Sequence, residues 1–109
     1  MNWALAILLV SASAAAAAER NTDIAIQRIA ADAGEIIGMA RHCQLDPVDI
    51  EDFYVAAEAR INALSDGPED RVMARIRLAN TASIEEAKGP AEGCEAFKTA
   101  FKKRFQVLR

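Results

Sequence analysis

The sequence predicts an all-α fold, a small antiparallel up-down bundle of about four helices held by one disulfide. Apolar residues make up 52% of the chain but aromatic residues only 6%, and alanine supplies much of the apolar content. Charged residues make up a further 27%, and the two-residue alternation typical of strands is lacking. Proline and glycine are few, and 109 residues allow one domain.

Residues 1–18 are predicted to be a secretory signal peptide, and residues 19–109 the helical domain. An apolar run from Trp3 to Val10 is followed by small residues that end at Ala18, which matches the apolar core and cleavage region of such a signal. The alternative is a retained membrane anchor, but the stretch is short for a span of about 20 residues. Cleavage would leave a periplasmic or secreted protein without stable membrane insertion.

The first helix of the domain is predicted from about Thr22 to Cys43. Its apolar residues recur at helical spacing and are Ile26, Ile29, Ala33, Ile36, Ile37, Ala40 and Cys43. Ala30, Gly34 and Gly38 form a row of small residues at a spacing of four. Each glycine costs about 1 kcal/mol relative to alanine, so the row is interpreted as a close helix crossing. Room for a ligand is the alternative, but nothing polar converges on the row.

The second helix has the clearest start signal in the chain. Asp46 is a good N-cap, Pro47 suits the first helical position, and the acids that follow favour the helix dipole. Gly67 and Pro68 are expected to end the helix. The predicted buried stripe is Ile50, Phe53, Tyr54, Ala57, Ile61 and Leu64.

The third helix is predicted to begin at Pro68. Its inward-facing residues are expected to be Val72, Met73, Ile76 and Ala79. The pattern loosens after Asn80, which favours one helix, bent or frayed there, that ends before Gly89. The fourth helix is predicted to begin near Pro90 or Ala91. Its stripe supplies most of the aromatic area of the core and comprises Cys94, Phe97, Phe101, Phe105 and Leu108.

The two cysteines are predicted to form a disulfide. Short connections make neighbouring helices antiparallel, so the end of the first helix and the start of the fourth lie at the same end of the bundle. Cys43 and Cys94 occupy these two positions, and an exported protein reaches a compartment where disulfides persist. Closing a loop of about 50 residues is worth roughly 4 kcal/mol on a chain-entropy estimate.

No catalytic, metal or cofactor site is predicted, and the protein is not expected to be an enzyme. His42 and Cys43 are adjacent, but neighbouring side chains on a helix do not face each other, and Cys43 has a disulfide partner. Met39 and His42 could share a face and ligate haem, yet these ligands are too few for haem or copper. A single histidine also argues against zinc.

Charge is segregated along the chain. Residues 46–70 hold eight acids and one base, whereas nine bases and four acids follow from residue 71 onward. Helix-dipole preferences explain most of this pattern. The candidate basic face for an acidic partner or anionic lipid is formed by Lys98, Lys102, Lys103 and Arg104.

The sequence therefore predicts a small exported protein that binds another protein, of unknown identity, and not nucleic acid. A net charge of −3 and the lack of a phosphate loop or an aromatic-basic pattern argue against nucleic acid. One version is an acid-stress chaperone that opens when acidification removes negative charge and leaves the positive charge. A second version is an immunity or inhibitor protein. A cofactor-binding bundle and an enzyme are the other classes.

Overall fold

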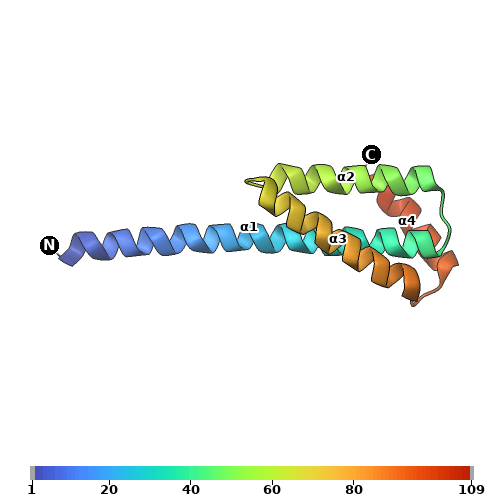
Figure 1. Cartoon of the computed structure of the whole chain (residues 1–109), viewed down its shortest axis with the longest axis horizontal. Coiled ribbons are helices and arrows are strands. Elements are labelled where there is room, and N and C mark those ends of the chain that lie inside the picture. Colours follow the sequence, from blue (N-terminus) through green and yellow to red (C-terminus); the bar gives the residue numbers. More distant parts are fainter. Residues whose placement is uncertain (1, 109) are drawn as a thin grey trace.

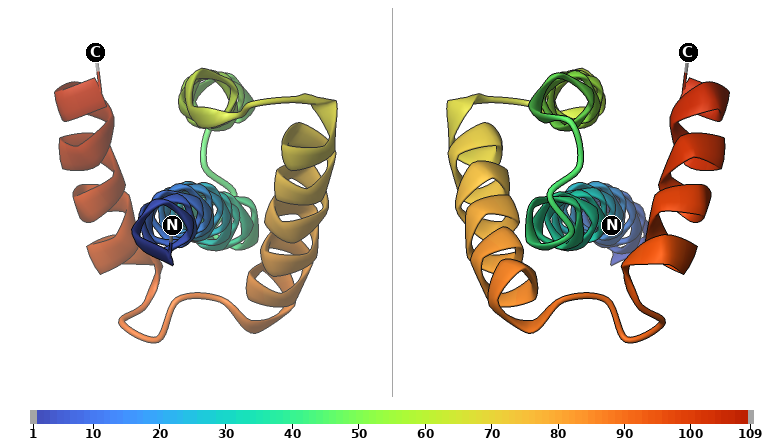
Figure 2. Two further views of the ribbon diagram at one scale, coloured as in Figure 1. Left: turned by 90° about the vertical axis from the view of Figure 1, so that its left-hand side faces the viewer. Right: turned by 90° about the vertical axis from the view of Figure 1, so that its right-hand side faces the viewer.

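Four helices make up the described part of the fold, with three of them arranged around the first, and the predicted all-α class is confirmed. The computed structural model describes the backbone of residues 2–108 and the side chains of residues 21–104. The helices are α1 (Asn2–His42), α2 (Pro47–Leu64), α3 (Pro68–Lys88) and α4 (Cys94–Leu108). Viewed along α1, the other three helices lie on different sides of it (Figure 2). α2 runs antiparallel to α1, whereas α3 and α4 cross it obliquely (Figure 1).

α1 begins at Asn2, well before the predicted start near Thr22. No proline or glycine interrupts this stretch, and the alanine run of residues 14–18 has the highest helix propensity. The N-terminal part of α1 projects beyond the other helices (Figure 1), and the buried side chains described on α1 begin at Ile26. The predicted signal peptide, residues 1–18, lies outside the residues whose side chains are described, so its cleavage stays a prediction.

The row of small residues on α1 is where α3 crosses, as predicted. A Cβ atom added to Gly34 would lie 2.5 Å from the carbonyl oxygen of Leu78, closer than real Cβ atoms come. A Cβ atom added to Gly38 would overlap the carbonyl oxygen of Ala82. The two helix backbones can therefore approach this closely only because both positions lack a side chain.

The prediction of which residues of α3 face inward is wrong. Val72, Met73, Ile76 and Ala79 are exposed. The buried residues of α3 are instead Ala74, Leu78 and Ala82. Because the two backbones nearly touch, the contact accommodates mainly small side chains. Apart from Leu78, the larger aliphatic residues of α3 consequently lie on the exposed sides of the helix.

Replacing Gly38 with valine is expected to lower the free energy of unfolding by about 1–3 kcal/mol, because the new side chain forces α1 and α3 apart. Urea unfolding measures the change. Glu35→Val, at an exposed position of the same helix, controls for the effect of a β-branched side chain in α1. Equal stability of the two variants would contradict the close crossing.

The start of α2 is confirmed in detail. The side chain of Asp46 accepts a hydrogen bond of 2.9 Å from the backbone N–H of Val48, and Pro47 is the first helical residue. Three members of the predicted stripe are buried, namely Phe53, Ala57 and Ile61. Ile50 and Tyr54 are half-buried, and Leu64 is exposed at the end of the helix.

α3 is a single helix from Pro68 to Lys88, which agrees with the prediction of one helix that continues past Asn80. α4, in contrast, begins at Cys94 and not near Pro90 or Ala91. The backbone of Gly89 has a φ of 77° and that of Gly93 a φ of 92°. These left-handed values are incompatible with a right-handed helix, so α4 can begin only after Gly93.

Aromatic contacts join α4 to α2. The ring centroids of Phe53 and Phe101 lie 5.7 Å apart, and those of Phe97 and Phe101 lie 6.1 Å apart. All three residues are buried. The predicted aromatic stripe of α4 is thus confirmed for Phe97 and Phe101, and Phe105 lies outside the residues whose side chains are described.

Candidate functional site

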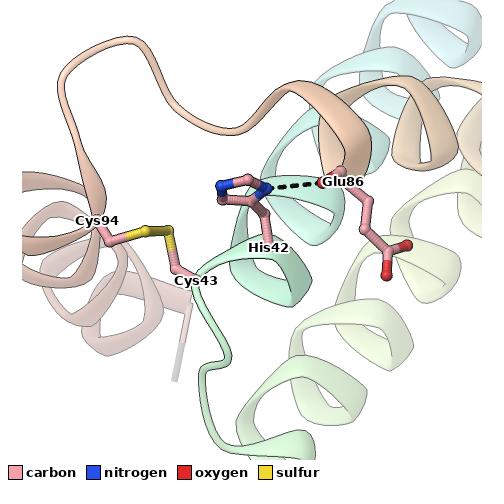
Figure 3. Close-up of a disulfide and its surroundings, with 4 residues drawn as sticks. All are labelled: His42, Cys43, Glu86 and Cys94. Atoms are coloured by element: carbon pink, nitrogen blue, oxygen red, sulfur yellow. Dashed lines mark hydrogen bonds between the residues drawn. A yellow bond between two sulfur atoms is a disulfide. The ribbon is translucent and has the colours of Figure 1, made fainter.

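The disulfide between Cys43 and Cys94 is present and links the end of α1 to the start of α4 (Figure 3). The Cα atoms of the two cysteines are 5.4 Å apart. Both cysteines lie at the same end of the bundle, which confirms the pairing predicted from the helix topology. Cys43 is therefore not a free thiol beside His42.

His42 holds the C-terminal end of α3 against α1 (Figure 3). Its Nδ1 lies 2.8 Å from the backbone carbonyl oxygen of Glu86, which can only accept, so Nδ1 carries the hydrogen and donates. The ring also packs against Gly89, where a Cβ atom would lie 2.5 Å from Nε2. His42 thus satisfies one of the carbonyl groups that a helix end leaves without an intrahelical partner.

His42→Ala is expected to lower the free energy of unfolding by about 0.5–1.5 kcal/mol, because it removes this hydrogen bond. Urea unfolding measures the loss. Arg41→Ala, an exposed neighbour in the same last turn of α1, is the matched control and should change stability by about 0.5 kcal/mol or less. A stability of His42→Ala equal to that of the control would show that the contact contributes nothing.

The four basic residues proposed as one face of α4 are spread around the helix. Lys98 and Lys102, four residues apart, share one side of α4. Lys103 and Arg104 follow at steps of about 100° and point in other directions. Arg104 lines a groove between α4, α1 and α2. The proposed basic face is therefore better described as separate positions, of which Arg104 lines a groove together with Arg28 of α1 and Arg60 of α2.

An exposed aliphatic surface on α3 is the most distinct candidate for a binding site. The exposed fractions are 53% for Val72, 57% for Met73 and 49% for Ile76. These three residues, called here the outer face of α3, point away from the buried Leu78. Sequence reasoning assigned them to the core. The sequence does contain a pattern that could have indicated the buried side of α3. Ala74 and Ala82 form a second apolar set, and their small side chains allow the close approach to Gly34 and Gly38 of α1.

Arginines flank the outer face of α3. Arg71, Arg75 and Arg77 are all exposed. Arg75 forms an ion pair with Glu58 of α2, and this is the single ion pair among the side chains of residues 21–104. Arg71 and Arg77 have no ionic partner in that part of the chain. Methionine and arginine are both enriched at protein interaction sites, and this surface contains Met73 with arginines around it.

Other kinds of site find no support among the residues that the structure describes. They contain no group of three or more acidic, histidine or cysteine residues that could hold a metal ion. Within these described residues, no helix is long and apolar enough to span a membrane.

No protein family model matches the sequence, and neither curated proteins nor solved structures show significant similarity to it.

Proposed function

We propose that this chain is a small exported protein that binds another protein through the outer face of α3. The observation that carries the proposal is the outward orientation of Val72, Met73 and Ile76. In a small domain with a limited core, aliphatic side chains gathered on one exposed face mark an interaction site. The surrounding arginines keep the protein soluble despite this apolar surface, and they attract an acidic partner.

The partner we propose is an amphipathic helix with an aliphatic stripe and acidic flanks. Helices are commonly recognised through apolar residues at spacings of three and four, and Val72 and Ile76 have this spacing. The acidic flanks of the partner would meet Arg71 and Arg77. The opposite charges of the arginines and the acidic flanks attract the two proteins to each other before contact, which increases the rate of association.

A second copy of the chain fits this face poorly. A two-fold antiparallel pair of α3 helices that matches Val72 of one copy with Ile76 of the other would place Arg71 opposite Arg77. Two arginines in direct opposition repel each other. This argument favours a different protein with acidic residues.

Export is the second part of the proposal. The disulfide is consistent with an oxidising compartment, either the periplasm or the outside of the cell. The apolar run and the small residues that end at Ala18 match the apolar core and cleavage region of a secretion signal, although no Lys or Arg precedes the run. Intact mass of the exported protein is expected to give a start at or near Glu19, and recovery of the full-length form would contradict the proposed processing.

Affinity capture from an extract of the native compartment, with matched variants, tests the proposal. A partner should be retained by the wild type and lost with the double variant Met73→Gln and Ile76→Gln. Val55→Gln, at an exposed aliphatic position on α2, should retain it. Titration of the purified partner should then show binding about tenfold weaker or more for the double variant.

Stability measurements separate lost binding from lost folding. Because Met73 and Ile76 are exposed, the double variant should unfold within about 0.5–1 kcal/mol of the wild type. Equal binding by the double variant and the wild type would overturn the proposal. So would equal loss with Val55→Gln, since that result would show nonspecific apolar adhesion.

The acid-stress chaperone differs from this proposal in its dependence on pH. A chaperone of that kind protects clients only after acid has opened the fold, whereas the outer face of α3 is already accessible in the folded protein. Suppression of client aggregation should therefore be compared at neutral and low pH. Protection that arises only at low pH, together with loss of tertiary structure, would favour the chaperone.

A further inference from the structure

A groove between α1, α2 and α4 has an apolar floor. Its volume is about 410 Å³, within the range of sites for small molecules. Ile29 and Ile36 of α1 and Phe53 and Ala57 of α2 are among the residues that line it. α4 lies on a different side of α1 from α3 (Figure 2), so the groove is separate from the outer face of α3.

Three arginines from three helices line this groove. They are Arg28 of α1, Arg60 of α2 and Arg104 of α4, and Asp32 is the one carboxylate among the lining residues. Within residues 21–104, where Arg75 and Glu58 form the single ion pair, none of the three guanidinium groups has an ionic partner. The groove therefore carries a net positive charge in a protein whose overall charge is −3.

Two of the three arginines lie together at one end of the groove. α1 and α2 run antiparallel from the turn that joins them (Figure 1), so residues at similar sequence distances from the turn lie side by side. Arg28 and Arg60 are such a pair, far from the turn, whereas Ile36 and Phe53 are closer to it. From Arg60 to Phe53 the groove follows α2 for about 10 Å, at 1.5 Å per residue.

We propose that this groove binds a free single-chain anionic amphiphile of the fatty-acid class. The carboxylate would lie at Arg28 and Arg60, and the alkyl chain would follow the floor towards Phe53. Arg104 lies nearer the Phe53 end, since Phe101, one turn before it on α4, packs on Phe53. Guanidinium groups bind carboxylates through paired, charge-assisted hydrogen bonds. The volume favours a molecule of this size over a helix of a partner protein. This site goes beyond the proposed protein binding and does not depend on it.

Calorimetric titration of the disulfide-bonded protein with decanoate tests the head and the tail of the ligand separately. Decanoate should bind about tenfold more tightly than decanol, which has the same chain length without the charge. Shortening the acid should weaken binding by up to about fourfold per methylene group, the value for a fully buried group. Equal affinity for decanoate and decanol, or no dependence on chain length, would overturn the proposal.

Variants place the ligand in the groove. Arg28→Gln and Arg60→Gln should each weaken decanoate binding by about tenfold. Ala56→Phe should block binding by filling the groove, which Ala56 also lines. Arg41→Gln, an exposed position at the end of α1, removes the same charge elsewhere and should leave the affinity unchanged. An equal loss with Arg41→Gln would show that net charge alone attracts the ligand, and the proposal would fail.

A membrane surface offers the same chemistry, so vesicles of phosphatidylglycerol form the last arm of the experiment. The free amphiphile should bind in the groove, and the protein should not sediment with the vesicles. Sedimentation that Arg60→Gln abolishes, without binding of free decanoate, would assign the arginines to a lipid headgroup and overturn the proposal. Circular dichroism of each variant confirms folding, and the chain-length series on the wild type remains informative if a variant is unfolded.

Discussion

Phe101→Ala is expected to lower the free energy of unfolding by about 3–5 kcal/mol. The Phe101 side chain is 4% exposed and contacts the rings of Phe53 and Phe97, so its removal leaves a cavity between α4 and α2. These aromatic contacts are the main apolar link described between the two helices. A loss of this size is a large fraction of the stability of a domain this small.

Urea unfolding measures the effect of Phe101→Ala. Phe101→Leu retains much of the volume and should cost less than half as much. Ile84→Ala, at an exposed position on α3, should change the free energy of unfolding by about 0.5 kcal/mol or less. A cost below about 1 kcal/mol for Phe101→Ala would mean that α4 does not pack on α2 as described.

Removal of the disulfide is expected to cost about 2–5 kcal/mol. Cys43 and Cys94 are 51 residues apart in the sequence, and the link restricts the unfolded chain over that whole loop. In the folded state it also holds the start of α4 on the end of α1. The double variant Cys43→Ser and Cys94→Ser avoids free thiols, and its unfolding should be compared with that of the oxidised wild type.

Reduction of the wild type is the matched control for the disulfide variant. It should give the same loss of stability, since both treatments remove the same link. Thiol labelling under denaturing, non-reducing conditions should find no free thiol in protein from the native compartment. If the double variant is as stable as the oxidised wild type, the disulfide does not stabilise the fold.

Helix boundaries could be read from the sequence where a local signal determines them. Asp46 and Pro47 begin α2 because the capping hydrogen bond and the proline geometry involve only residues close in sequence. The start of α4 is misjudged because Pro90 suggests a helix start, whereas Gly93 has a left-handed backbone that the sequence does not reveal. The start of α1 differs because the alanine run allows the helix to continue towards the N-terminus.

The disulfide and the helical class were determined by the sequence alone. Two cysteines allow one pairing, and helical periodicity with short connections places both at one end of the bundle. The glycine row likewise predicted a close crossing, because glycine inside a helix is costly unless another backbone needs the space.

Only the tertiary structure decided which side of α3 faces the core. The helix has an aliphatic side with Ile76 and a side with Ala74 and Ala82, and periodicity alone favours burial of the larger residues. Contact with Gly34 and Gly38 reverses this choice, because backbones that nearly touch leave room mainly for small side chains. The grouping of arginines from three helices around one groove also depends on how distant segments pack, which no local pattern contains.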